Sequence, residues 1–290
     1  MRRKIILISV CSIVLLGILI ATYFFFADIE STPTKEIMQN CHVEQQKEQN
    51  RTVFKVTPKE GAKNDIVIFY LHGGSYVAEM TQNHWNFIQA IVNDTGASVI
   101  LPDYPLTPKY HYQDVFEMII PVYEKLLQKI DSQNIIIMGD SAGGGMALAL
   151  CEYLQEKQII EPSKLILISP WLDVTLENPE IEKIEPYDKK LNKESLKIAG
   201  LAYAGGNQEN LKNYLVSPLY GNVENLKNIT IYTGTYDILN PDVKELLKKN
   251  ANIVVKEYEG KSHIWLIDER EEAKEEYQDL IKQITDKNIE

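Results

Sequence analysis

The 290-residue sequence has few cysteines and no basic cluster in its body. Only Cys11, Cys41 and Cys151 are present, without Cys-x-x-Cys or His-rich spacing, so neither a metal site nor a disulfide framework is predicted. Cys41 and Cys151 could pair in an oxidising compartment, although free thiols are the simpler interpretation. Lysine and arginine form no run outside residues 2–4, and the net charge is −11. We therefore expect no nucleic-acid partner, because phosphate contacts dominate that affinity.

The N-terminal 27 residues differ from the rest of the sequence. Ile5–Ala27 carries no charge over 23 residues, enough for roughly 34 Å of helix against a hydrocarbon core of about 30 Å. Basic residues 2–4 precede it and acidic residues follow, so the positive-inside rule predicts a membrane anchor with the remaining chain on the extracellular side. Secretion after signal cleavage is the alternative, but a signal peptide usually has a shorter apolar core. The polar residues 28–50 are predicted to be a stalk or the start of a cap.

Residues 51–290 alternate β-rich and amphipathic segments. Strands are predicted over Thr52–Thr57, Asp65–Leu71, Ala97–Leu101, Asn134–Met138, Lys164–Ser169, Ile229–Gly234 and Asn252–Tyr258. Helices are predicted over Thr81–Asp94, Val115–Ile130 (kinked or restarted at Pro121), Ala142–Lys157, Pro241–Asn250 and Asp268–Ile284. This order predicts an α/β fold with a mostly parallel central sheet and helices on both faces. The pattern fails over about 171–220, which we predict to be a helical cap inserted above the sheet.

The motif Gly139-Asp140-Ser141-Ala142-Gly143 fits G-x-S-x-G and lies between a predicted strand and a predicted helix. That setting is what the motif requires. A sharp turn strains the serine, and the flanking glycines let neighbouring backbone approach closely. The helix N-terminus also supplies free N–H groups near a developing oxyanion. We therefore predict that Ser141 is a nucleophile and not merely a capping serine in a glycine-rich turn.

A glycine-rich loop, His72-Gly73-Gly74-Ser75, ends another predicted strand. Acyl transfer needs N–H donors fixed where negative charge develops on the carbonyl oxygen, and losing one donor costs about 3–4 kcal/mol. The predicted oxyanion hole comprises Gly73, Gly74, Ser75 and Ala142, with the N–H groups of the last three as donors. His72 is predicted to hold the loop by hydrogen bonds and not to act as a base.

These motifs resemble the hormone-sensitive-lipase-like branch of the α/β hydrolases, which includes many bacterial esterases. His72–Tyr76 resembles that family's HGGG loop, residues 139–144 match its GDSAGG elbow, and residues 103–108 resemble its DYRLAPE segment. Ser169–Asp173 resembles the segment after the next strand, and Ser217–Leu219 the one before the strand that bears the acid. The resemblance implies an α/β-hydrolase fold with a helical cap.

The resemblance covers about Ile66–Trp265 and includes two departures. Ser75 replaces the third glycine, which costs about 1 kcal/mol if its φ is positive. Pro105 and Thr107 replace the usual arginine and alanine, so the way in which that loop is pinned is left open. The predicted membrane anchor lies outside the shared region.

The fold's chain order places an acid and then a base after the nucleophile. His263 is the one histidine past Ser141 and follows a predicted strand, so it is the predicted base. Asp237 ends a Gly-x-x-Asp turn after the strand Ile229–Gly234, where the family places its acid. Asp242, five residues on, is the local competitor, and we interpret it as a contact or cap near the next helix.

The predicted function is a serine carboxylesterase that acts through an acyl-enzyme. The family resemblance implies short- to medium-chain acyl esters as its substrates. We expect a small-molecule ester substrate and neither a metal nor an organic cofactor. An amidase, formamidase or peptidase on the same fold is the first alternative. A catalytically idle, membrane-tethered binding protein is the second. The sequence does not indicate the natural substrate or the oligomeric state.

Overall fold

The computed structural model of the protein describes residues 30–286. The predicted membrane segment Ile5–Ala27 therefore lies outside the described residues. Among the helices of residues 30–286, none is long and apolar enough to cross a membrane.

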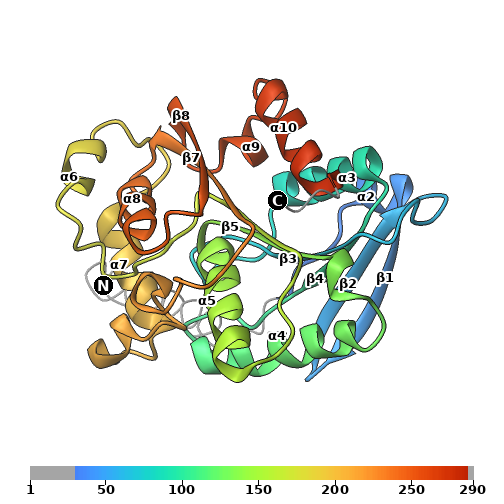
Figure 1. Ribbon diagram of the computed structural model, residues 1–290, viewed down its shortest axis with the longest axis horizontal. Coiled ribbons are helices and arrows are strands. Elements are labelled where there is room, and N and C mark those ends of the chain that lie inside the picture. Colours follow the sequence, from blue (N-terminus) through green and yellow to red (C-terminus); the bar gives the residue numbers. More distant parts are fainter. Residues whose placement is uncertain (1–29, 287–290) are drawn as a thin grey trace, which may run out of the picture.

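An eight-stranded sheet forms the centre of the molecule, in the order β1-β2-β4-β3-β5-β6-β7-β8 (Figure 1). The strands are β1 (Cys41–Glu48), β2 (Arg51–Pro58), β3 (Val67–Leu71), β4 (Ser98–Pro102), β5 (Ile135–Asp140), β6 (Lys164–Ile168), β7 (Ile229–Tyr236) and β8 (Val254–Ser262). β2 pairs antiparallel with both β1 and β4, and all the other pairs are parallel. The prediction of a mostly parallel sheet is confirmed.

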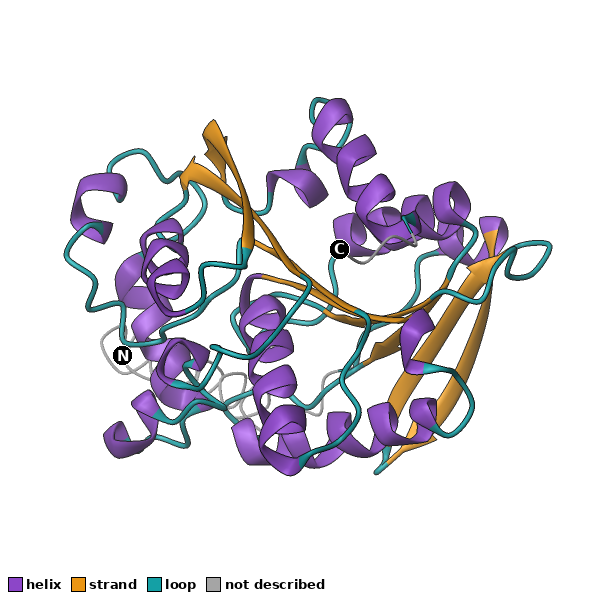
Figure 2. Ribbon diagram, viewed as in Figure 1, coloured by secondary structure: helices purple, strands orange, loops and turns teal. Residues whose placement is uncertain are grey.

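Helices cover both faces of this sheet (Figure 2). They are α2 (Lys35–Asn40), α3 (Gln82–Thr95), α4 (Tyr112–Leu127), α5 (Ser141–Lys157), α6 (Ile181–Ile184), α7 (Lys193–Tyr203), α8 (Asn240–Lys249), α9 (Trp265–Asp268) and α10 (Lys274–Thr285), with 3₁₀ turns η1 (Ser132–Asn134), η2 (Gln208–Lys212) and η3 (Pro218–Tyr220). Along β3, Ile68 and Tyr70 join the core beneath α3, α9 and α10, whereas Phe69 and Leu71 join the core beneath α4 and α5. Burial on both faces explains why β3 is continuously apolar.

Residues 28–50 were expected to form a stalk or the start of a cap, and that prediction is wrong for its larger part. Residues 35–40 form α2, and residues 41–48 form β1 at the edge of the central sheet. Only Cys41 of β1 is fully buried. A mostly exposed edge strand does not require apolar residues at every second position. The sequence of residues 41–48 therefore lacks the alternation by which a strand is predicted.

Two predicted helices also differ in detail. α4 continues through Pro121 as one helix and does not restart there. The predicted C-terminal helix Asp268–Ile284 begins later than expected, as α10 at Lys274, and residues 269–273 separate it from the short helix α9, which ends at Asp268. Between 171 and 220 the described chain forms α6, α7 and 3₁₀ turns without a strand, as the loss of periodicity indicated.

Glu152 is a carboxyl group buried on α5. It is 4% exposed, and neither of its carboxyl oxygens has a hydrogen-bond partner among the described residues. Burial raises the pKa of Glu152 to about 9, and the nearby Lys249 offsets only part of this effect. The side chain is therefore neutral in the folded protein at pH 7, whereas in the unfolded chain it is ionised.

We expect Glu152→Gln to stabilise the protein increasingly as pH rises. In the wild type, the unfolded state releases the Glu152 proton near pH 4.5 and the folded state only near pH 9, so stability falls between these values. Glutamine has no proton to lose, and the variant should gain roughly 1–3 kcal/mol at pH 8 and little near pH 5. Thermal denaturation at both pH values tests this, with the exposed Glu156→Gln as control. A difference in melting temperature that does not change with pH would contradict it.

Candidate active site

The G-x-S-x-G segment forms a sharp turn between β5 and α5. Ser141 is the first residue of α5 and has φ of 52°, in the left-handed region that L-residues rarely adopt. A Cβ at Gly143 would overlap the carbonyl oxygen of Leu71, and one at Gly145 would overlap that of Trp171. Close backbone packing on two sides of the helix thus holds the strained turn in place and requires glycine at both positions.

Ser141, His263 and Asp237 lie in one hydrogen-bonded chain. His263 Nε2 is 2.9 Å from Ser141 Oγ, and His263 Nδ1 is 2.8 Å from Asp237 Oδ2. A carboxylate oxygen only accepts hydrogen bonds, so His263 Nδ1 must carry the proton that it donates to Asp237. The lone pair of Nε2 then faces the serine hydroxyl. The three residues come from the carboxyl ends of β5, β7 and β8, where parallel α/β sheets place their sites. The structure therefore brings together the three residues predicted from the sequence.

The imidazole of His263 is electrostatically tuned by its surroundings. Burial alone would lower the pKa of His263, but the adjacent carboxylate of Asp237 raises it above its ordinary value. Asp188 adds to this increase from the cap. A base with a raised pKa accepts the serine proton more readily, although it is neutral only above that pKa.

Asp242 is not a competitor for the role of acid. It lies in the first turn of α8 and accepts a hydrogen bond from Asn178 Nδ2 at 2.9 Å. The second oxygen of Asp237, in contrast, accepts from the backbone N–H of Leu239 at 2.9 Å, which fixes its carboxylate toward His263. The local hydrogen bonds thus distinguish two carboxylates that the sequence places only five residues apart.

The His72–Ser75 loop lies over the elbow, and the N–H of Gly73, a residue placed in the predicted oxyanion hole without a donor role, is engaged within the protein. The N–H of Gly73 donates to Asp140 Oδ1 at 3.0 Å, so Gly73 anchors the loop and does not face a substrate oxygen. Gly74 and Ser75 have φ of 114° and 53°, and their N–H groups make no hydrogen bond to the described part of the chain. The strain expected for serine at this position is therefore present, and these two N–H groups are available as donors.

Asp140 connects the loop to the elbow and was not predicted as a site residue. Its Oδ1 also accepts from Tyr70 Oη at 2.6 Å, and its Oδ2 lies 3.2 Å from His84 Nε2. Burial would raise the pKa of Asp140, but His84 and the hydrogen bond from Tyr70 hold it below its ordinary value. His84 Nδ1 accepts the N–H of Thr81, so its Nε2 carries the proton that points to Asp140.

His72 holds its loop by hydrogen bonds, as predicted. Its Nδ1 donates to the carbonyl oxygen of Gly73 at 2.6 Å, and its ring stacks on Tyr104 with centroids 4.3 Å apart. Tyr104 Oη donates to the carbonyl oxygen of His72 at 2.6 Å. Burial lowers the pKa of His72 to about 4, so the ring is neutral at pH 7. The base for Ser141 is His263, whose Nε2 faces the serine hydroxyl.

The segment with Pro105 and Thr107 is pinned through the residues that precede it. The Arg51 guanidinium donates to the carbonyl oxygens of Asp103 and Tyr104 at 3.0 and 3.2 Å. It also pairs with the Asp103 carboxylate at 3.4 Å, and both side chains are buried. Arg51 of β2 therefore pins the segment in which Pro105 and Thr107 replace the usual arginine and alanine.

Aromatic side chains pack beside Ser75 and the elbow. Tyr76 stacks on Tyr203 of α7 with centroids 3.6 Å apart and on Trp171 with centroids 5.4 Å apart. The backbone N–H of Trp171 donates to the carbonyl oxygen of Ser141 at 2.8 Å, so this cluster lies directly against the elbow. All three rings are buried, and with Ser141 only 5% exposed the cap covers the site.

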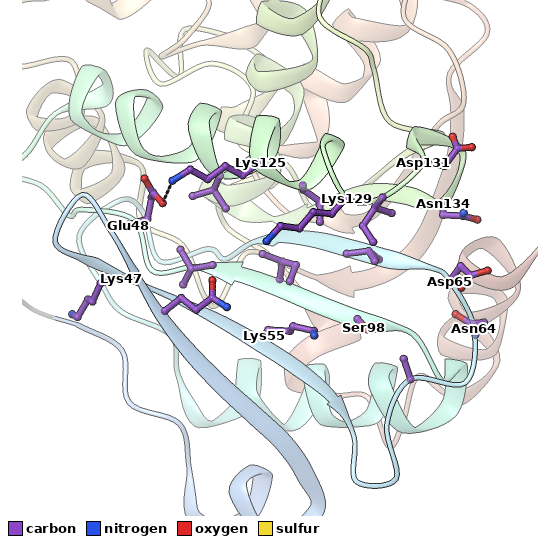
Figure 3. Close-up of a pocket in the computed structure, with 18 residues that line it drawn as sticks. Lys47, Glu48, Lys55, Asn64, Asp65, Ser98, Lys125, Lys129, Asp131 and Asn134 are labelled. Carbon is purple, nitrogen blue, oxygen red and sulfur yellow. Dashed lines mark hydrogen bonds and ion pairs between the residues drawn. The ribbon is translucent and has the colours of Figure 1, made fainter.

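A cavity of about 530 Å³ lies elsewhere, between α4 and strands β1 to β4 (Figure 3). Its walls include apolar residues such as Val53, Ile100 and Leu126, and Lys125 at its rim pairs with Glu48. Its lining includes Asn64 and Asp65, just before β3, whereas Ser141 lies at the carboxyl ends of the strands. None of its lining residues belongs to the triad or the His72–Ser75 loop, so this cavity is not the place for a reacting ester.

Within residues 30–286, no group of His, Cys, Asp and Glu side chains is arranged to hold a metal ion.

A family described as the alpha/beta hydrolase fold matches residues 68–267, more than half of the chain. The chain belongs to this family. The alpha/beta hydrolase predicted from the elbow and the glycine-rich loop is thereby confirmed. A hormone-sensitive lipase from a metagenome library shares the fold, with a TM-score of 0.79 over 88% of this chain and 86% of that one, at 22% identity.

Other alpha/beta hydrolases are similar in sequence. An esterase of Acinetobacter venetianus is 34% identical over 68% of this chain, which spans 65% of that esterase, just under two thirds. An acetyl-hydrolase of Streptomyces hygroscopicus is 27% identical over 68% of this chain and 67% of its own length. The solved structure of an esterase/lipase from an uncultured bacterium has a TM-score of 0.76 and 25% identity, covering 88% of this chain and 85% of that one.

Proposed function

We propose that this alpha/beta hydrolase is a serine carboxylesterase that hydrolyses short- to medium-chain acyl esters. The observation that carries the proposal is the chain from Asp237 Oδ2 through His263 to Ser141 Oγ, with contacts of 2.8 and 2.9 Å. Relatives named as an esterase and an acetyl-hydrolase support the same reaction class. Carboxylic ester hydrolysis needs no more than this triad and an oxyanion hole.

The proposed mechanism follows from the roles of these groups. His263 Nε2 takes the proton of Ser141 as its Oγ attacks the acyl carbon, and the N–H groups of Gly74, Ser75 and Ala142 receive the developing oxyanion. The imidazolium then gives its proton to the leaving alkoxide as the C–O bond breaks, which leaves an acyl-enzyme. A water molecule, deprotonated by His263, releases the acid and regenerates Ser141. Asp237 holds the Nδ1–H tautomer and stabilises the imidazolium throughout.

The aromatic cluster supports a preference for small acyl groups. Tyr76, Trp171 and Tyr203 pack against one another beside the elbow, and we infer that they border the acyl site and limit its length. Their rings are fully buried and held in contact from both the main domain and the cap. Widening this region would require separating rings that are stacked, which loses dispersion contacts and aromatic pairing.

Hydrolysis of p-nitrophenyl acetate, butyrate and octanoate, compared with p-nitroanilide analogues of the same acyl groups, tests the proposal. We expect turnover of the acetate and butyrate esters, much slower turnover of the octanoate, and little cleavage of the anilides. Preferential cleavage of the anilides would assign an amidase or peptidase instead. No turnover by folded protein, together with no labelling of Ser141 by a fluorophosphonate, would favour a non-catalytic binding protein.

We further propose that a membrane anchor formed by Ile5–Ala27 holds the catalytic domain on the extracellular side. The 23 uncharged residues and the basic residues 2–4 before them support this arrangement. Protease treatment of intact cells should then remove the domain while leaving cytoplasmic proteins whole. Recovery of the domain from the medium would instead indicate secretion after cleavage, and full protection would refute the orientation.

A further inference from the structure

One segment of the cap contacts both loops that carry the acid and the base. Asp188 Oδ2 accepts the backbone N–H of Ile238, the residue after Asp237, at 3.0 Å. Lys190 Nζ donates to the backbone carbonyl oxygen of His263 at 3.0 Å. We call residues 188–191 the cap strap.

The cap strap is itself held in a single conformation. Asp188 Oδ1 accepts the N–H groups of Lys190 and Leu191, both at 2.9 Å, so both carboxylate oxygens are occupied. Lys190 Nζ also pairs with Asp268 and Glu269, each at 3.1 Å, in addition to the His263 carbonyl oxygen. An ammonium has three donors, and all three have partners here.

The loop that carries His263 needs such support. His263 directly follows β8, the last strand of the sheet, which pairs on one side only and has no fully buried residue. The next residue, Ile264, has φ of 45° and is held by a hydrogen bond from its N–H to Ser169 Oγ at 3.1 Å. Edge strands and the loops after them are the parts of a sheet with the least packing to hold them. A second attachment from the cap therefore limits the movement of the imidazole.

We propose that Asp188 and Lys190 are positioning residues that set the geometry of Asp237 and His263 from the cap. The inference rests on the proposed function of this site. It gives the cap a role besides covering the substrate, because the segment that closes over the site also aligns its acid and its base. Small displacements of catalytic groups cost large factors in rate, so the loss of either attachment should be visible in turnover.

Substitution of Lys190 tests the attachment to the base. Lys190→Met keeps the aliphatic stem and removes all three donors, and we expect kcat for p-nitrophenyl acetate to fall about tenfold while KM changes less than about twofold. Lys190→Arg keeps a positively charged donor that can reach the carbonyl oxygen of His263, so its kcat should remain close to that of the wild type. Lys183→Met, on the cap helix α6, removes an ion pair to Glu180 that touches neither loop, and it should leave kcat unchanged.

Substitution of Asp188 tests the attachment to the acid and has a separate signature. Three carboxylates, those of Asp237, Asp188 and Asp140, raise the pKa of His263. Asp188→Asn keeps an acceptor for the N–H of Ile238 but removes one of these three negative charges. The acidic limb of kcat/KM should move down by about 0.3–0.5 pH units, because the imidazolium loses part of its stabilisation. Asp188→Ala removes the acceptor as well and should lower kcat in addition. Damage to cap packing alone would not move the limb in this direction.

The pKa and the exchange broadening of the His263 imidazole, measured by NMR with ¹⁵N-labelled histidine, give a readout that does not depend on turnover. A lower pKa in Asp188→Asn and a broadened imidazole signal in Lys190→Met support the proposal even if the wild type hydrolyses no ester, and in that case only the esterase function fails. An unchanged imidazole pKa and an unbroadened imidazole signal in both variants overturn the proposal whether or not the protein is an esterase.

Discussion

Replacing Ser141 with alanine should lower kcat/KM for p-nitrophenyl acetate by about 10⁴- to 10⁶-fold, to the level of binding and oxyanion stabilisation without a nucleophile. The fold should be unaffected, because among residues 30–286 Ser141 Oγ is hydrogen-bonded only to His263 Nε2, and the φ of 52° is imposed by the packing around it. Steady-state kinetics measures the loss, and circular dichroism with thermal denaturation verifies folding. Ser195→Ala on the exposed side of α7 is the matched control and should retain full activity.

The triad also predicts how substitutions combine. His263→Ala should cost nearly as much as Ser141→Ala, and the double variant should be no worse than either single one, because the two groups act as a unit. Additive losses would indicate that Ser141 and His263 serve separate steps. Equal turnover in Ser141→Ala and wild type would remove the serine mechanism altogether and direct attention to another nucleophile.

Replacing Asp140 should damage both stability and activity. Asp140→Ala leaves Tyr70 Oη, the N–H of Gly73 and His84 Nε2 without their shared acceptor in a site that is 0% exposed at Asp140. Removing one partner of a buried charged or hydrogen-bonded pair, such as Asp140 and His84, costs about 3–5 kcal/mol of folding free energy. Because Gly73 anchors the donor loop, kcat should also fall by about 10²- to 10³-fold, comparable to losing one oxyanion donor.

Asp140→Asn separates the two effects of Asp140. Asparagine retains one oxygen acceptor for Tyr70 and Gly73, but its amide nitrogen would face the Nε2–H of His84 as a second donor, so we expect an intermediate loss of stability and a smaller loss of kcat. Chemical denaturation and kinetics well below the melting temperature provide the two measurements, with Asp131→Asn at the exposed N-cap of the 3₁₀ turn η1 as control. A folded Asp140→Asn with wild-type stability and a kcat reduced as far as in the alanine variant would contradict an anchoring role.

The spatial convergence of Ser141, Asp237 and His263 could be predicted because each follows a strand that the sequence marks clearly. Parallel strands end at one edge of a sheet, so residues placed after three such strands meet without further information. The mostly parallel order was predictable for the same reason, since apolar runs buried on both faces leave a strong signal.

The partners of Asp140 could not be predicted in the same way. His84 lies 56 residues before it on α3, and their pairing depends on how that helix crosses the sheet. A histidine beside Trp85 on the apolar side of the predicted helix was the available signal, because a buried histidine needs a polar partner. β1 was missed for the opposite reason, as a polar edge strand has no periodicity by which to recognise it.

The glycines of the elbow bear on the order in which the site can be assembled. Gly143 lies against the backbone at the end of β3, and Gly145 lies against the backbone that follows β6. One segment that precedes the motif in the sequence and one that follows it therefore hold the turn at Ser141 in its strained conformation. β3 precedes β5 in the chain, so a nascent chain that ends shortly after α5 would lack only the surface that follows β6. It would thus carry the complete motif before it carries the strained turn at Ser141. The reactive hydroxyl is a property acquired only after β6 and the Pro170–Trp171 segment have docked.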